Sequence, residues 1–417
     1  MAHRIIINNL GPIEHVDMQV DDFMIFTGPQ ASGKSTIAKA IYLFRSVKDD
    51  LYRLILRKWN EPDLTVLKTL TDELAKKMFL TLGLASFNPK EQCKEVCGIE
   101  YYYSESVYLR LHDISTGHFE GVFEGLGSFL EEPAVEDAPT YGPEDGKKLR
   151  AMLDDLFCFR EEPVFIPADR SFLTLLSSKW NHIYMGLDDR EQRELDFGTH
   201  EYIKLVAKIR NSYGDKKEGI KVPEITKKIL KGSYLYNVDT RSDYLIHERR
   251  DGGGTRGIAI NYASSGQQES LWILNILSYY LAQQKPAFFI IEEPESHLFP
   301  ETQDELMRFI ALVKNAGHQV LITTHSPYVL GSVNNLLYAH QVGQKAPDET
   351  AKIIPPEQWL DPDTFAGYFV EDGRARDAVD EETRLFQNEV IDKASENINA
   401  AFDALLELNY SGAEEEN

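Results

Sequence analysis

Residues 23–39 of this 417-residue chain read FMIFTGPQASGKSTIAK. An apolar run of strand length leads to Gly28, and the residues that follow fit the pattern G-x-x-x-x-G-K-[ST] without a mismatch. The two glycines let the backbone curl so that successive N–H groups face an anion, and a helix starting near Lys34 adds the positive end of its dipole. Because a strand precedes the motif and a helix follows it, we predict a phosphate-binding loop.

The loop predicts contacts with ATP and Mg²⁺. Lys34 would reach the β- and γ-phosphates, and the Ser35 hydroxyl would ligate Mg²⁺. The residues expected to contact the nucleotide are Gly28, Pro29, Gln30, Ala31, Ser32, Gly33, Lys34, Ser35 and Thr36.

A second apolar strand, 287–291, ends in the carboxylates Glu292 and Glu293. Five apolar residues before the pair favour a buried parallel strand over a surface acidic run. Glu292 would hold Mg²⁺ through water, and Glu293 lies where a base can deprotonate an attacking water. A third such strand, 319–324, ends at His325, which is either structural or a group that faces the γ-phosphate.

The stretch 261–276, NYASSGQQESLWILNI, predicts an amphipathic helix that opens at Gln267. Ser264 and Gly266 would place a hydroxyl and free N–H groups at its N-terminus, which forms either an ordinary helix cap or a second anion site. Because one chain needs only one γ-phosphate cradle, the second site would face the nucleotide of another subunit.

The composition indicates a globular protein, with 42% hydrophobic residues and a net charge of -23. This charge disfavours broad adhesion to nucleic acid. The three cysteines form no disulfide framework, as expected in a reducing cytoplasm. Neither a membrane-spanning run nor a signal peptide is predicted, so we expect a cytoplasmic protein with no membrane contact.

The rest of the chain alternates between helical and strand patterns. Short strands are predicted at 4–8 and 18–20, and a strand precedes the polar residues Asp169, Arg170 and Ser171. A half-solvated antiparallel sheet is predicted from Gly98, and the other expectations are helices at 49–87, 149–157 and 172–229, an exposed loop at 121–146, strands at 234–260, 336–342 and 368–373, and a closing helix at 384–408.

The segment 204–231 contains nine basic residues and three acidic ones. It is either a solvated helical face or a contact for nucleic acid or an acidic partner. The basic residues are Lys204, Lys208, Arg210, Lys216, Lys217, Lys221, Lys227, Lys228 and Lys231.

Together, these stretches resemble the ABC-type ATPases of the RecF and SMC branch, and most narrowly the bacterial ATPases related to the overcoming-lysogenization-defect (OLD) nucleases. The similar residues are GPQASGKST (28–36), SSGQQE (264–269), IIEEPESHLFP (290–300) and TTHSP (323–327), supported by IPADRS (166–171). The chain has neither the long heptad array of SMC proteins nor the order of acidic residues found in a Toprim nuclease domain.

The resemblance implies that two heads pair head to tail on two ATP molecules. It assigns the signature role to Ser264 and Gly266, with Ser265 in place of a glycine, and adds Gln267 to the nucleotide contacts. It assigns the catalytic glutamate to Glu293 and the switch histidine to His325. Glu292 stands where the family more often has aspartate. The family's lobe-joining glutamine has no clear counterpart here, and Asp169 and Arg170 occupy roughly its position.

We therefore expect an α/β, ABC-type ATPase head with a P-loop sheet core, an antiparallel β lobe and a helical lobe. The expected function is Mg²⁺-dependent ATP hydrolysis in a homodimer or higher oligomer that controls a separate effector, a nuclease or toxin, in bacterial anti-phage defence. The alternatives are a RecF-like DNA-repair ATPase and an ATP-bound scaffold with incidental turnover. The expected parts are a nucleotide-binding core (1–48 and 245–345), an inserted helical segment and β lobe (49–171), a helical lobe with the basic segment (172–244) and a C-terminal extension (346–417).

Overall fold

The computed structural model describes residues 3–57, 65–82, 97–112, 120–125, 143–171, 196–214, 220, 222–248 and 254–387. An 11-stranded mixed sheet forms its centre, with strand order β6-β5-β4-β1-β2-β14-β13-β3-β12-β11-β7. The strands of this sheet are β1 (His3–Leu10), β2 (Ile13–Val20), β3 (Phe23–Thr27), β4 (Gly98–Tyr102), β5 (Tyr108–His112), β6 (Glu120–Glu124), β7 (Glu162–Ile166), β11 (Ala287–Glu292), β12 (Gln319–Thr323), β13 (Phe365–Glu371) and β14 (Arg374–Asp377).

The sheet has a parallel half and an antiparallel half. Strands β13, β3, β12, β11 and β7 run parallel to one another. Strands β2, β1, β4, β5 and β6 pair antiparallel. This arrangement confirms the predicted α/β class with an antiparallel β lobe, and it confirms the strands expected at 4–8 and 18–20.

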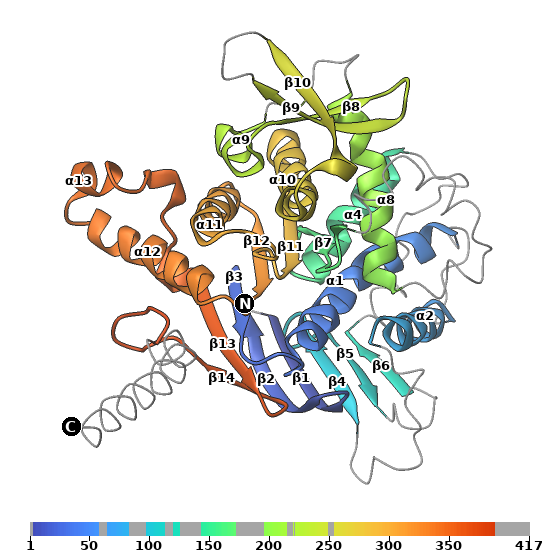
Figure 1. The fold of residues 1–417 in the computed structure, drawn as a ribbon. Helices are drawn as coiled ribbons and strands as arrows, with labels where there is room; N and C mark the ends of the chain where they lie inside the picture. The colour runs from blue at the N-terminus through green and yellow to red at the C-terminus, as the bar shows by residue number, and fades with distance from the viewer. Residues whose placement is uncertain are drawn as a thin grey trace, which may run out of the picture.

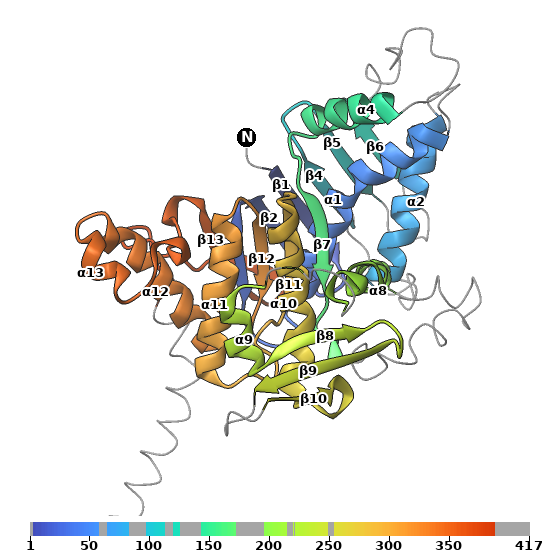
Figure 2. The same ribbon diagram turned by 90° about the horizontal axis from the view of Figure 1, so that it is seen from above.

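Helices cover both faces of the sheet because successive side chains of the parallel strands point to opposite faces. Phe289, Ile291 and Ile322 pack into a core with the helices on one face, whereas Phe288 and Ile290 pack with those on the other. Helices α1 (Lys34–Arg57), α2 (Thr65–Thr81) and α4 (Pro143–Leu156) lie beside β4–β6 (Figure 2). The opposite face carries α8 (Phe197–Arg210), α9 (Glu224–Leu230), α10 (Ser265–Gln283), α11 (Pro300–Asn315) and α12 (Pro327–Gly343).

A small antiparallel sheet lies over the end of this helical layer (Figure 1). Its strands are β8 (Ser233–Asn237), β9 (Ser242–Glu248) and β10 (Thr255–Ala259), as expected for residues 234–260. Tyr234 of β8 packs edge-on against Trp272 of α10. The expected helix is present and begins at Ser265 rather than at Gln267. Every residue from Gln268 to Ser278 is buried, so α10 is covered on most of its surface and the expected amphipathic character was wrong.

The strand predicted at 336–342 is also wrong. These residues belong to α12, which begins after the N-cap Ser326 and buries side chains at the helical spacing of Val329, Val333 and Leu336. The place beside β3 is taken by β13, which confirms the strand expected at 368–373. After α12 the chain forms the short helix α13 (Pro347–Ala351), which projects with it at the left of Figure 1.

Other expectations are met in part. Helices α1 and α2 confirm the helical pattern in the described parts of 49–87, which are 49–57 and 65–82, and α4 confirms the helix expected at 149–157. In 172–229, α8 and α9 make up most of the described residues. The loop expected at 121–146 begins with β6 and ends with α4, and its residues 126–142 lie outside the described ranges, as does nearly all of the helix expected at 384–408. In the part of the chain that the structure describes, no helix combines the length and apolar character needed to cross a bilayer.

Candidate nucleotide and phosphate site

The predicted phosphate loop joins β3 to α1 and needs glycine at both ends. Gly28 has φ +138° and Gly33 has φ +106°, conformations that L side chains rarely adopt. A Cβ at Gly28 would lie 2.2 Å from the carbonyl oxygen of Val370 in β13, and one at Gly33 would lie 2.3 Å from Cδ1 of Ile13. The loop therefore lies against the β1–β2 turn on one side and against β13 on the other.

Lys34 lies under the loop and is only 5% exposed. Its Nζ donates to the carbonyl oxygens of Gly28 (2.9 Å) and Pro29 (2.6 Å) and to Oγ of Ser32 (3.3 Å). Burial lowers the pKa of Lys34 to about 8, although the carboxylates of Glu293 and Glu295 oppose the shift. The ammonium is thus held where it can turn from loop carbonyls to a bound phosphate.

Glu292 ends β11 with its carboxylate almost fully buried. One oxygen, Oε2, accepts a hydrogen bond from the Ala168 amide (3.4 Å), and the other, Oε1, has no hydrogen-bond partner among the described residues. Burial raises the pKa of Glu292, opposed by Lys39 and by the nearby Ser35 hydroxyl. A buried carboxylate oxygen without a partner, next to a hydroxyl at the start of α1, is a donor set that fits Mg²⁺.

Glu293 and His325 face each other beside the loop. Nε2 of His325 lies 3.2 Å from Oε1 of Glu293, and its Nδ1 lies 3.1 Å from the carbonyl oxygen of Gly28. Both contacts are hydrogen bonds at the same time only when the ring carries two protons, because each oxygen is an acceptor. The hydrogen bond from His325 lowers the pKa of Glu293, which is 37% exposed. This carboxylate is therefore ionised at neutral pH and accessible to water.

Glu295 belongs to the same cluster, although the sequence analysis did not select it. One of its oxygens accepts hydrogen bonds from Oγ1 of Thr324 (2.6 Å) and from the amide of His325 (2.9 Å). The carboxylate is buried and thereby fixes the backbone on which His325 sits. Its signal in the sequence was a third carboxylate directly after the Glu292–Glu293 pair and a proline.

The structure separates the two polar residues of the IPADRS stretch. Asp169 is exposed, whereas Arg170 is completely buried beneath the end of β11. Nη1 of Arg170 lies 2.5 Å from the carbonyl oxygen of Glu292 and donates to it. Among the described residues, no hydrogen bond or ion pair joins Asp169 to the cluster, whereas Arg170 binds the backbone of Glu292 and Glu293.

The N-terminus of α10 forms a capping box. Oγ of Ser264 accepts from the Gln267 amide (3.4 Å), and Oε1 of Gln267 accepts from the Ser264 amide (3.1 Å). Gly266 lies against the backbone of the segment after the acidic pair, since a Cβ there would be 2.6 Å from the carbonyl oxygen of His297. Within the described ranges, no hydrogen bond joins residues 264–267 to residues 28–36. This end of α10 thus acts as a cap within its own chain and is open to solvent at Ser264 and Ser265.

The basic segment is less available than its sequence indicates. Arg210 is buried and forms a two-pronged ion pair with Asp243, while Lys204 pairs with Glu201 and Lys227 with Glu224. Three of its lysines, Lys216, Lys217 and Lys221, lie outside the described residues. The described part of this segment resembles a solvated helical face more than a nucleic-acid site.

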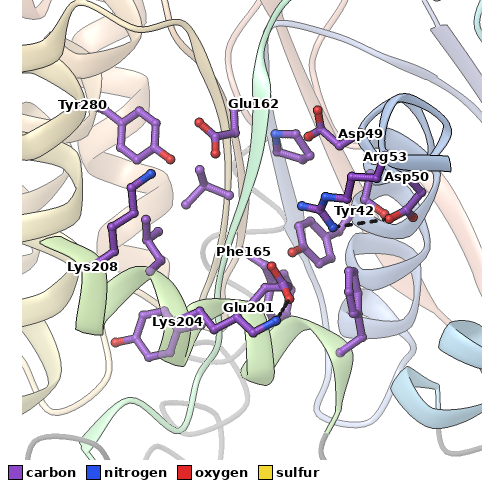
Figure 3. A pocket seen from close by; sticks show the side chains of 16 residues that line it. Tyr42, Asp49, Asp50, Arg53, Glu162, Phe165, Glu201, Lys204, Lys208 and Tyr280 are labelled. Carbon is purple, nitrogen blue, oxygen red and sulfur yellow. Dashed lines mark hydrogen bonds and ion pairs between the residues drawn. The ribbon is translucent and has the colours of Figure 1, made fainter. Parts of the chain in front are cut away.

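A cavity of about 240 Å³ lies beside β7 and is lined by residues of α1, β7 and α8 (Figure 3). Two ion pairs join residues that line it: Arg53 lies 3.7 Å from Asp50, and Lys204 lies 2.9 Å from Glu201. None of the predicted nucleotide contacts lines it. The phosphate loop, and not this cavity, is therefore the candidate site.

Comparison with known families gives one sequence match. A family model described as an AAA ATPase domain matches residues 1–120 and 159–330. A comparison with curated proteins found no match.

Three similar solved structures are heads of SMC proteins. An SMC head domain from Thermotoga maritima is 10% identical, with 90% of this chain and 98% of that chain covered and a TM-score of 0.39. A Pyrococcus furiosus Smc head with an extended coiled coil, bound to the C-terminal domain of ScpA, is 12% identical, with 95% and 98% covered and a TM-score of 0.41. An SMC head bound to the C-terminal winged-helix domain of ScpA is 12% identical, with 90% and 95% covered and a TM-score of 0.39.

Proposed function

This chain belongs to the AAA ATPase domain family, and from that premise we propose that it binds ATP with Mg²⁺ and hydrolyses it at the site between β3, β11 and β12. The observation that carries the proposal is the position of Glu293. Its carboxylate follows a buried strand, is partly exposed, and lies 3.2 Å from His325, whose other ring nitrogen contacts the phosphate loop. The His325 side chain thereby connects the proposed base, Glu293, to the phosphate loop.

The phosphate loop supplies the binding energy. The backbone N–H groups of Gly28 and of residues 30–33, together with the N-terminus of α1, attract the phosphate chain, and Lys34 adds a nearly buried positive charge. Ser35 and Glu292 would hold Mg²⁺, which neutralises phosphate charge when it is bound. The buried Glu292 oxygen without a hydrogen-bond partner supports this role.

Glu293 acts as the general base. Its lowered pKa keeps the carboxylate ionised, the form that takes a proton from an attacking water. In the described conformation His325 occupies one of its oxygens. We propose that the γ-phosphate draws His325 away from Glu293, so that the base becomes free only when ATP is bound.

A second subunit completes the site in this proposal. Ser264, Gly266 and Gln267 would approach the nucleotide of a partner head, because the N-terminus of α10 is exposed and makes no hydrogen bond to its own described phosphate loop. Three exposed aromatic residues are close in sequence to the N-terminus of α10, to the acidic segment and to His325. They are Tyr262 (81% exposed), Phe299 (69%) and Tyr328 (56%). Exposed aromatic residues are enriched at protein interfaces, which supports pairing through this side of the head.

The proposed output of pairing is control of an effector protein. The resemblance of four motifs to ATPases related to OLD nucleases supports a nuclease or toxin as the effector and anti-phage defence in the bacterial cytoplasm as the setting. Copurification of the tagged chain from its own host, with and without ATP, tests it by identifying whether a nuclease or toxin is retained.

The experiment that tests hydrolysis measures phosphate release from ATP and Mg²⁺ together with binding of a fluorescent ATP analogue. Replacing the base by Glu293→Gln should lower kcat by about 10²–10⁴-fold while the nucleotide still binds. The matched control is Glu301→Gln, an exposed carboxylate in the first turn of α11, which should leave kcat unchanged. Equal turnover by the Glu293→Gln variant and the unmodified protein would show that the base lies elsewhere.

A further inference from the structure

Arg170 makes an unusual set of contacts for a fully buried charge. Its guanidinium donates to the backbone carbonyl oxygens of Pro167 (2.7 Å), Glu292 (2.5 Å), Glu293 (2.9 Å) and Glu269 (3.2 Å). Its Nε also lies 3.5 Å from the Glu269 carboxylate. All four hydrogen bonds thus go to main-chain oxygens, and two of them lie at the carboxyl end of β11.

These contacts complete a frame around the backbone of Glu293. The residue has φ +42°, an uncommon conformation for a non-glycine residue that persists only where its surroundings hold it. Its amide donates to the Thr323 carbonyl oxygen of β12 (2.9 Å), and Arg170 binds the carbonyl oxygens on both sides of its Cα. The backbone from which the Glu293 side chain projects is therefore held by one strand and one arginine.

The same arginine reaches the first turns of α10. Glu269 lies five residues after the cap residue Ser264, and its carbonyl oxygen and carboxylate both face Arg170. The end of α10 assigned to the partner's nucleotide and the backbone of the proposed base are thus attached to one rigid planar group.

We propose that Arg170 is a positioning residue for ATP hydrolysis: it holds Glu293 in its reactive direction and links that direction to α10. This inference rests on the proposed function of Glu293. Lysine keeps the charge but has no planar fork, so it cannot bind several divergent carbonyl oxygens at once. A displaced base costs turnover but leaves the phosphate loop intact.

The test compares kcat and KM for ATP in the unmodified protein, Arg170→Lys, Glu269→Gln and Glu293→Gln. For Arg170→Lys, kcat should fall about 10²-fold, the effect of a misplacement near 1 Å, with KM and binding of the fluorescent ATP analogue unchanged. Glu269→Gln removes only the ionic partner and should lower kcat less. The kcat of the double variant, Arg170→Lys with Glu269→Gln, should be no lower than that of Arg170→Lys alone, because the two residues act as a unit.

Arg210→Lys is the matched control. Arg210 is also buried and bound to a carboxylate, Asp243, but it contacts neither β11 nor the phosphate loop. The Arg210→Lys variant should be less stable than the unmodified protein, with kcat unchanged. The proposal is overturned if folded Arg170→Lys keeps the full kcat. It is also overturned if kcat and ATP affinity fall together in Arg170→Lys, or if Arg210→Lys lowers kcat as much as Arg170→Lys does.

Two further results keep the inference separate from the proposed function. If Arg170→Lys does not fold, Glu269→Gln decides, and an unchanged kcat in that variant overturns the role of Arg170. If the unmodified protein releases no phosphate, or Glu293→Gln retains full turnover, the proposed function fails first, and the positioning role fails with it.

Discussion

The contact between Gly28 and Val370 predicts a large effect for Gly28→Ala. Gly28 has φ +138°, and an added Cβ would lie 2.2 Å from the Val370 carbonyl oxygen, an atom of the β13 backbone that cannot rotate away. Backbone strain of this kind costs about 1–3 kcal/mol. Overpacking against a fixed neighbour costs about another 1–3 kcal/mol. The free energy of unfolding should therefore fall by about 2–6 kcal/mol.

Gly317→Ala isolates the strain from the clash. Gly317 also has a positive φ, +96°, but a Cβ there meets nothing within 4 Å. In urea unfolding, the Gly28 variant should lose about 1–3 kcal/mol more than the Gly317 variant. Binding of the fluorescent ATP analogue should weaken only in the Gly28 variant, since its phosphate loop has to move. Equal stability and equal ATP binding in the two variants would refute the claim that β13 supports the loop.

Two other predictions follow from buried charges. Lys34 loses its proton as pH rises through about 8, so ATP affinity should fall over that range. The ATP affinity of Lys34→Arg, which stays charged, should not change. Titration of ATP binding between pH 7 and 9.5 checks this, and parallel curves for the two proteins would contradict it. The unfolded chain keeps that proton to its usual pKa of 10.5, so between these two values the shift adds stability as pH rises. Asp243→Ala leaves the Arg210 charge buried without its partner and should cost about 3–5 kcal/mol in urea unfolding, whereas a loss as small as that of an exposed pair would show that Arg210 reaches water.

Much of the site could be predicted because its motifs are local. The phosphate loop needs only a strand, two glycines and a helix start, all within residues 23–39, and the structure has this local order. The acidic pair and His325 follow short apolar runs that indicate buried strands, which are β11 and β12. The family match confirms the resemblance to a P-loop ATPase domain.

Other features depend on contacts between distant segments. The apolar run at 336–342 is compatible with a strand or a helix, and the sheet position it would have filled belongs to β13. Arg170 has mostly main-chain partners, so no spacing of side chains in the sequence reveals them. The burial of α10 on most sides likewise depends on the small sheet β8–β10 packing over it.

The central claim, that ATP brings two heads together, is tested most directly by the mass in solution of the Glu293→Gln variant with and without ATP and Mg²⁺. This variant should bind ATP without consuming it, and Lys34→Ala, which should not bind ATP, is its control. Our account predicts a shift from monomer to dimer with ATP in the first variant and no shift in the second. A Glu293→Gln protein that binds ATP and stays monomeric would contradict the account.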